Sequence, residues 1–192
     1  MEKMAAMLPS EKPYDQTTIF ETYKARMPWL LLLMISATFT GKIIESFEEE
    51  LKAYTILTAF IPMLMDTGGN AGSQSSVSVI RALSLNDIEF KDIFKVMWKE
   101  SKVAILCSLT LALCNFLKLL IIDRIPLLVS LTVCLTLIVT IILAKLIGCT
   151  LPMIAKKLKF DPAVMASPFI TTIVDACSLL IYFYIAKLLL GI

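Results

Sequence analysis

Long apolar runs, separated by short charged segments, make up most of this sequence. Five of the runs approach the roughly 20 apolar residues that a helix needs to cross a bilayer. The expected spans are residues 29–44, 53–83, 103–122, 126–146 and 162–192. The pattern therefore predicts an all-α integral membrane protein whose five transmembrane helices form one domain over residues 28–192.

The segment before the first span, residues 1–27, is polar and has no apolar core long enough for a signal peptide. Thr18 and Glu21 have the spacing of a capping box, which opens a helix. Apolar and charged side chains then fall on opposite faces: Ile19, Phe20, Tyr23 and Met27 on one, and Glu21, Lys24 and Arg26 on the other. We expect a short amphipathic helix on the membrane surface that ends at Pro28, where the first span begins.

The basic residues predict the orientation of the chain. Four lie before the first span, five in residues 81–102 and four in residues 145–159, where Lys145 counts as a loop residue. Only five of the 18 lie on the other side of the predicted membrane. Because Lys and Arg concentrate in cytoplasmic loops, we expect a cytoplasmic N-terminus and an extracytoplasmic C-terminus in a multi-pass protein of the cell (inner) membrane.

Composition excludes several classes of function. A net charge of +2 gives no footprint for nucleic acid. The sequence has no histidine, which removes the usual general base and the commonest zinc ligand. Its five cysteines form no C-x-x-C pair and lie in or beside apolar runs, so we expect small buried side chains and no disulfide framework. We expect no enzymatic activity.

The most unusual stretch is residues 66–76, DTGGNAGSQSS, which is polar and glycine-rich inside the second predicted span. Its glycines, together with Pro62, predict a bent or locally unwound helix. Small residues four apart, such as Gly68 and Gly72, also allow two helices to cross closely. Packing alone does not explain Asp66, Asn70 and Gln74, whose polar side chains need partners or water at that depth. The stretch is a candidate for packing, for an ion path, or for both.

Asp175 lies near the middle of the fifth predicted span, where a carboxylate is costly unless it has a partner, a proton or water. Helical spacing puts it on a hydroxyl-rich stripe: Ser167, Thr171, Asp175, Ser178 and Tyr182. This stripe is typical of the wall of a hydrated cation path. The alternative is a structural tie from Asp175 to Arg81, Lys118 or an amide of the polar stretch. Asp66 is the one candidate for a second deep acid.

Three segments resemble the MgtE family of magnesium channels. They are residues 62–74 (PMLMDTGGNAGSQ) with 80–83 (IRAL), residues 174–175 (VD) with 179–183 (LLIYF), and residues 25–30 (ARMPWL). The P-x₅-GGN-x-GSQ element is long enough to be highly specific. The resemblance covers roughly residues 15–190, and the five-span topology agrees with it.

The resemblance implies a homodimer in the lipid bilayer, with one pore at the two-fold interface lined by the second and fifth helices. It implies that Asp175 of both subunits binds hydrated Mg²⁺ and that Thr171 contributes a backbone carbonyl. On these two helices we expect the pore to be lined by Asp66, Gly69, Asn70, Ser73, Gln74, Ser167 and Ser178. Mg²⁺ loses its water reluctantly, so a site that contacts the hydration shell suits it.

The sequence departs from the family pattern in two respects. Ser178 stands where a glycine is expected after the pore acid. Typical members also carry a cytoplasmic acidic N-domain and paired CBS domains that sense magnesium, and this sequence has no counterpart of either. Three alternatives follow: constitutive conductance, gating by another means such as a separate cytoplasmic regulator, or a sequence that is part of a longer protein.

Two other functions stay open beside a channel for divalent cations. One is an exchanger, in which Asp175 couples Mg²⁺ to a second ion. The other is a membrane scaffold that transports nothing and uses the glycine-rich stretch only to pack helices.

Overall fold

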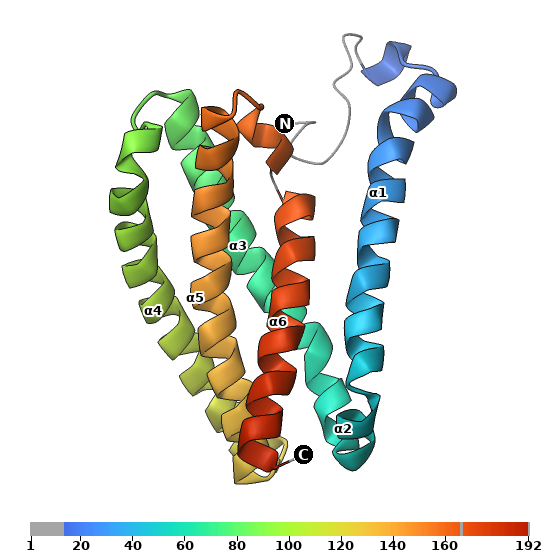
Figure 1. Cartoon of the computed structure of the whole chain (residues 1–192), viewed down its shortest axis with the longest axis vertical. Helices are drawn as coiled ribbons and strands as arrows, with labels where there is room; N and C mark the ends of the chain where they lie inside the picture. Colours follow the sequence, from blue (N-terminus) through green and yellow to red (C-terminus); the bar gives the residue numbers. More distant parts are fainter. Residues whose placement is uncertain (1–13, 166, 192) are drawn as a thin grey trace.

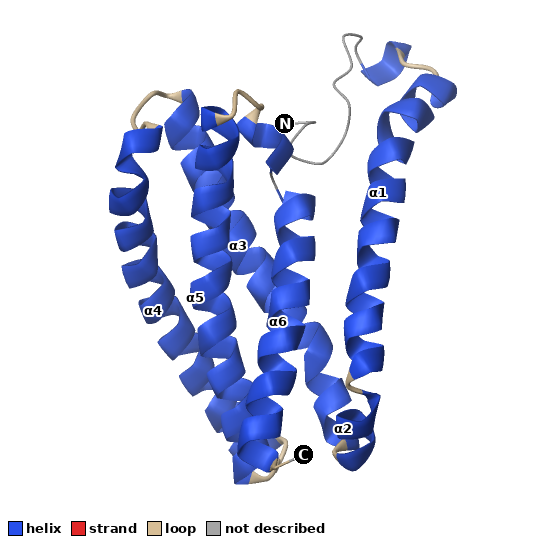
Figure 2. Cartoon of the chain, in the orientation of Figure 1, coloured by secondary structure: helices blue, strands red, loops and turns tan. Residues whose placement is uncertain are grey.

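The computed structural model describes residues 14–165 and 167–191, and all regular structure in these residues is helical (Figures 1 and 2). The α-helices are α1 (Ile19–Ser46), α2 (Glu48–Ala53), α3 (Ile61–Ser84), α4 (Ile93–Leu117), α5 (Leu127–Lys157) and α6 (Ser167–Leu190). Short 3₁₀ turns cover Tyr14–Gln16, Thr55–Phe60, Phe90–Asp92 and Pro162–Met165, and a π-helical turn, Lys118–Ile122, extends α4. The prediction of an all-α protein is confirmed.

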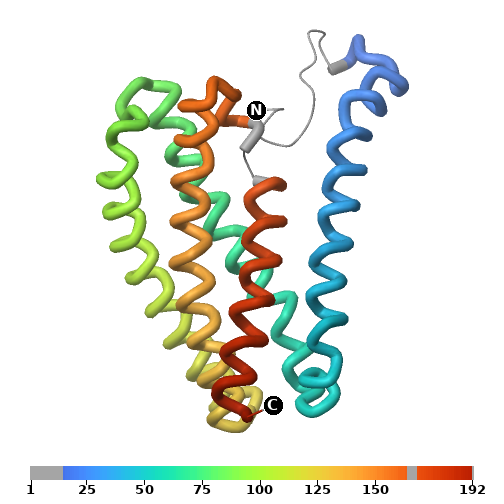
Figure 3. The backbone as a smooth tube through the Cα atoms, in the orientation of Figure 1, coloured from blue at the N-terminus to red at the C-terminus, as the bar shows by residue number. Residues whose placement is uncertain are grey.

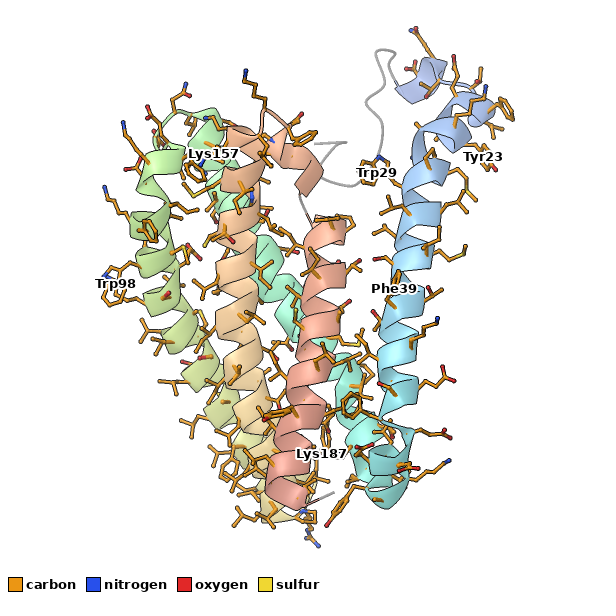
Figure 4. The ribbon with its side chains drawn as sticks, in the orientation of Figure 1. Tyr23, Trp29, Phe39, Trp98, Lys157 and Lys187 are labelled. Atoms are coloured by element: carbon orange, nitrogen blue, oxygen red, sulfur yellow. The ribbon has the colours of Figure 1, made fainter. Side chains whose placement is uncertain are left out.

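The long helices run between the two ends of the molecule (Figure 3). One end carries the start of α1, the connection from α3 to α4 and the connection from α5 to α6. The opposite end carries α2, the turn from α4 to α5 and the end of α6. Lys157 on α5 and Lys187 on α6 mark these two ends (Figure 4). Among the described residues, the start of α1 and the α3–α4 and α5–α6 connections, where most basic residues lie, are therefore at one end of the molecule.

Among the described residues, four helical segments are long and apolar enough to cross a membrane: Ile19–Ser46, Phe90–Ile122, Leu127–Lys157 and Pro168–Leu190. The long α3 is not among them, because the polar residues of its middle lower its hydropathy. The structure thus shows four membrane-competent segments where the sequence predicts five spans. The short α2 and the 3₁₀ turn after it lead from α1 into α3.

The core lies where α5 packs against α3, α4 and α6, and α3 also packs against α6. Leu64 of α3, Ile141 of α5 and Val174 of α6 belong to this core and are fully buried or nearly so. The first helix differs from the others: α1 stands to one side, packs on α6, and buries only Thr40 among its side chains (Figure 1). Its remaining apolar surface suits lipid contact.

Glycines set how closely α3 approaches its neighbours. A Cβ added to Gly148 of α5 would lie 2.1 Å from the backbone oxygen of Gly72, so the two helices touch backbone to backbone. One turn earlier, a Cβ on Gly68 would lie 2.7 Å from Thr140 of α5 and 3.0 Å from Val174 of α6. These are the close crossings that small residues permit in membrane proteins.

The prediction that a new helix begins at Pro28 is wrong. Thr18 caps the helix as expected, since its side chain accepts from the Glu21 N–H and the Glu21 carboxylate accepts from the Thr18 N–H. The helix then continues through Pro28 to Ser46 as one element, in place of a separate short helix. A single proline removes one helical hydrogen bond, and a long transmembrane helix tolerates that loss.

The predicted local unwinding of the second span is also wrong, and the alternative of a bent helix stays a prediction. The α-helix starts at Ile61, later than the expected position near residue 53, and is then continuous to Ser84. Pro62 lies in its first turn, where a missing N–H costs nothing. The glycines do not unwind the helix because α5 and α6 hold them on both sides.

Two further helices are longer than expected. The fourth span, expected to end at residue 146, is a helix that runs through Gly148 and Pro152 to Lys157. Residues 84–102, between the second and third expected spans, are also largely helical, because α4 begins at Ile93. Pro28 and Pro152, which sequence patterns associate with helix ends, both lie inside long helices.

The Gly72–Gly148 contact predicts a large effect of one methyl group. The methyl group of Gly148→Ala would collide with the Gly72 backbone, which cannot move aside as a flexible side chain could. We therefore expect the free energy of unfolding to fall by about 3 kcal/mol or more. Gly41→Ala in α1 is the matched control, because nothing lies within 4 Å of its added Cβ. Unfolding in detergent, followed by circular dichroism, measures both. Equal stability of the two variants would contradict the backbone contact.

Three contacts tie the α1–α3 connection to α6. The rings of Phe47 and Phe183 stack with centroids 4.6 Å apart, and the Tyr182 hydroxyl donates to the Leu57 carbonyl at 3.0 Å. At the end of α6, the Lys187 ammonium pairs with the Glu50 carboxylate at 3.0 Å. The hydrogen bond from Lys187 lowers the pKa of Glu50 below its ordinary value.

The Glu50–Lys187 pair predicts a pH dependence. Because the pKa of Glu50 is lower in the folded than in the unfolded protein, the pair stabilises the fold above the ordinary pKa of 4.5 and loses this effect as the pH falls through the lowered value. We expect Lys187→Met to raise the pKa of Glu50 and to remove this acid-dependent loss. Lys52→Met is the control, since Lys52 pairs with Glu48 on the exposed surface. Unfolding temperatures between pH 3 and pH 7 test the prediction, which fails if both variants follow the wild type.

Candidate functional site

The polar stretch of α3 has two faces. Asp66, Asn70 and Gln74 follow one another at intervals of one turn, and all three side chains are exposed in the single chain. Gly68 and Gly72 are buried against α5 and α6 on the other side of the helix. The packing and the polar interpretations of this stretch therefore apply to different residues of the same helix.

A cavity of about 420 Å³ lies between α3 and α6, and two acidic residues, Asp66 and Asp175, line it. Its lining is Ile61, Pro62, Met65, Asp66, Gly69, Asn70, Thr171 and Asp175. Gly69 makes this approach possible, because a Cβ there would lie 3.0 Å from Thr171 and 3.7 Å from the Asp175 Oδ1. Asp66 was the one residue that the sequence indicated as a second acid inside the membrane, and the structure puts it in the same cavity as Asp175.

The half-buried side chain of Asp175 makes no hydrogen bond or ion pair with another residue in the part of the chain that the structure describes. Lys118, one of the partners considered from the sequence, pairs instead with Asp123 at 2.7 Å. A carboxylate in this position is available to a cation or to water.

The hydroxyl stripe of α6 divides into two parts. Thr171 lines the cavity, and its hydroxyl donates to the Pro168 carbonyl at 2.9 Å. Farther along, Ser178 is buried and donates to the Val174 carbonyl at 2.6 Å, and Tyr182 is buried and bonds to Leu57. Ser167 begins α6, and its side chain lies outside the described part of the structure.

Two more cavities adjoin the first along α3. One, of about 580 Å³, is lined by Asn70, Ser73, Gln74, Val77 and Ser78. The other, of about 550 Å³, lies between α3, α4 and α5 and includes Asp66, Asn70, Gln74 and Lys145 in its lining. Asn70 borders all three cavities, so the polar face of α3 is hollowed along several turns.

The prediction that Lys145 is a loop residue is wrong. The structure buries this lysine in the middle of α5, with 4% of its surface exposed. Its ammonium donates to the Ser75 hydroxyl at 3.5 Å. The error came from ending the helix near residue 146; the apolar run that continues past Gly148 could have revealed it.

These features define a multi-pass helical membrane protein with an acid-containing cavity between two of its helices. A family model described as a divalent cation transporter, MgtE, matches residues 61–185, which span α3 to α6. The chain belongs to the MgtE family. This is a family of transporters and not of enzymes, which agrees with the prediction from the sequence.

Curated relatives give the same assignment. The magnesium transporter MgtE of Thermus thermophilus is 35% identical over 190 residues, which is 99% of this chain and 42% of the relative. The magnesium transporter MgtE of Bacillus subtilis is 37% identical over 177 residues, 90% of this chain and 38% of the relative. The chain thus spans well under half the length of these relatives.

The shared cavity predicts that Asp66 and Asp175 act on one cation. A cation that binds the folded protein raises its stability, by about 2.7 kcal/mol at 100 times the dissociation constant. We expect Mg²⁺ to raise the unfolding temperature of the wild type, and Asp66→Asn and Asp175→Asn each to reduce the increase. The double variant should lose no more than the more severe single variant, because both carboxylates contact the same ion. Strictly additive losses would indicate two separate sites.

Proposed function

We propose that this protein conducts Mg²⁺ across the membrane along a path between α3 and α6. The observation that carries the proposal is the shared cavity, in which Asp66 and Asp175 lie together with Asn70 and Thr171. The names of the relatives as magnesium transporters support it.

The chemistry of the cavity suits a hydrated divalent cation. Mg²⁺ prefers oxygen ligands and keeps most of its water, so groups that contact the hydration shell are sufficient to hold it. The carboxylate of Asp175 is the main site, and the Thr171 backbone carbonyl and Asn70 amide contact the shell. Asp66, Gly69, Ser73, Gln74 and Ser167 complete the proposed lining of the path, whereas the buried Ser178 packs against Gly68.

The exposed polar face of α3 supports a homodimer. Asp66, Asn70 and Gln74 lie at a depth where lipid would leave them without partners. A second copy, related by a two-fold axis along the path, covers this face with its own α3 and α6. It also brings a second Asp175 to the same axis, so that two carboxylates hold one ion.

The proposed topology has five spans, with α3 as the polar one. The ends of α1, α3–α4 and α5–α6 that lie together carry most of the basic residues, so they face the cytoplasm of a cell (inner) membrane protein. The first turns of α1, where Ile19 and Phe20 are exposed, lie at the membrane surface. A separate cytoplasmic regulator would contact this side.

The test is Mg²⁺ flux into proteoliposomes. We expect Asp175→Asn to lower the flux about tenfold or more, which corresponds to a loss of about 1.4 kcal/mol of stabilisation of the ion. Asp87→Asn, in the exposed connection after α3, is the control and should transport like the wild type. The amounts of reconstituted protein must be equal.

The same assay separates the other functions. An exchanger would need a gradient of a second ion, so flux that stops when that gradient is removed would replace the channel. A scaffold would give no flux in the wild type while still assembling. Undiminished flux in Asp175→Asn would remove this residue from the path.

A further inference from the structure

Three side chains on three helices form a polar bridge beside the cavity between α3, α4 and α5. The Lys145 ammonium of α5 donates to the Ser75 hydroxyl of α3 at 3.5 Å, and that hydroxyl donates to the Glu100 carboxylate of α4 at 2.5 Å. Ser75 therefore accepts one hydrogen bond and donates another. Lys145 is 4% exposed and Ser75 is 2% exposed. We call these three residues the Lys145 bridge.

The burial of Lys145 calls for an explanation. A lysine among membrane-spanning helices is costly and is retained where it has a specific role. Buried charged networks contribute little net stability compared with apolar packing, but they can select one register or orientation among several similar ones. The Lys145 bridge is therefore better explained by an effect on the orientation of the helices than by an effect on the stability of the fold.

The adjacent helix crossing explains why orientation needs such a device. Ser75 lies three residues after Gly72, where α3 meets α5 through the backbone of Gly148. Two glycine surfaces have no side chains that interlock, so this contact sets the distance between the helices but does not itself fix their rotation about the helix axis. The hydrogen bond from Lys145 to Ser75, less than one turn from Gly72, can fix this rotation.

Rotation of α3 matters because its polar face moves as a unit. Gln74 is the residue before Ser75, and Asn70 and Asp66 lie one and two turns earlier on the same face. We propose that Lys145, Ser75 and Glu100 are positioning residues, which fix the rotation of α3 and so aim Asp66, Asn70 and Gln74 at the ion path. The inference rests on the proposed function for its purpose, but the geometry it claims can be tested without transport.

The first test measures which face of α3 meets water. Cysteine is introduced at Gln74, on the polar face, or at Val79, which is 4% exposed and faces the core. Each variant is reconstituted in liposomes and treated with a water-soluble maleimide, and mass spectrometry reads the modified peptide so that the native cysteines do not interfere. In the wild-type background, Gln74→Cys should react much faster than Val79→Cys.

The bridge variants should change this ratio of rates. We expect Ser75→Ala and Lys145→Met to lower it about fivefold or more, and Lys145→Arg to retain most of it because arginine still donates to Ser75. Lys99→Met, which removes an exposed charge next to Glu100, is the control and should leave the ratio unchanged. If Lys145→Met does not fold, Ser75→Ala decides, since it removes only a hydroxyl. An unchanged ratio in folded Ser75→Ala would overturn the proposal.

A second test separates positioning from stability. Lys145→Met with Glu100→Gln removes both charges, so no unpaired buried charge is left and the fold should be as stable as the wild type. A positioning role predicts that the double variant still needs about fivefold more Mg²⁺ for half-maximal flux, at a similar maximal rate. Wild-type flux at both parameters would show a purely structural bridge and overturn the proposal. Absence of flux in the wild type would refute the proposed function, and the maleimide ratio would still decide on the bridge.

Discussion

The contact between Gly72 and Gly148 is the constraint on which the rest of the bundle depends. It lets α3 lie against α5 with no side chain between the two backbones. At that distance Gly68 and Gly69 meet side chains of α6, and Gly69 comes within reach of Thr171 and Asp175. The cavity with two acids exists because three helices approach one another this closely. Larger residues in place of these glycines would move Asp66 and Asp175 apart, although no polar side chain would be altered.

The polar stretch of α3 combines two properties that usually occur on different helices. One side consists of small residues such as Gly68 and Gly72, which pack against α5 and α6, and the other carries Asp66, Asn70 and Gln74. A continuous α-helix serves both, because its period separates neighbouring residues onto opposite sides. An unwound segment would instead have exposed backbone groups to lipid, which is costly.

Much of the fold and of the site could be predicted from the sequence, because both depend on local patterns. Apolar runs identify membrane helices, and a carboxylate such as Asp175 stands out within one. The prolines were misleading: Pro28 and Pro152 lie inside long helices, where the surrounding helix compensates for one lost hydrogen bond. The partners of Lys145 could not be predicted, because Ser75 and Glu100 are brought to it only by the packing of three helices.

The position of α1 has a consequence for how the protein is made. Of the described helices, α1 is synthesised before the others, yet its main packing partner, α6, is synthesised after them. Throughout the synthesis of α3, α4 and α5, α1 must persist in the bilayer as an independent helix. Its sequence meets that requirement, because residues 29–41 carry no charged side chain on any side of the helix and the finished fold buries only Thr40 of α1. The assembly of the bundle is therefore completed by its two terminal helices meeting.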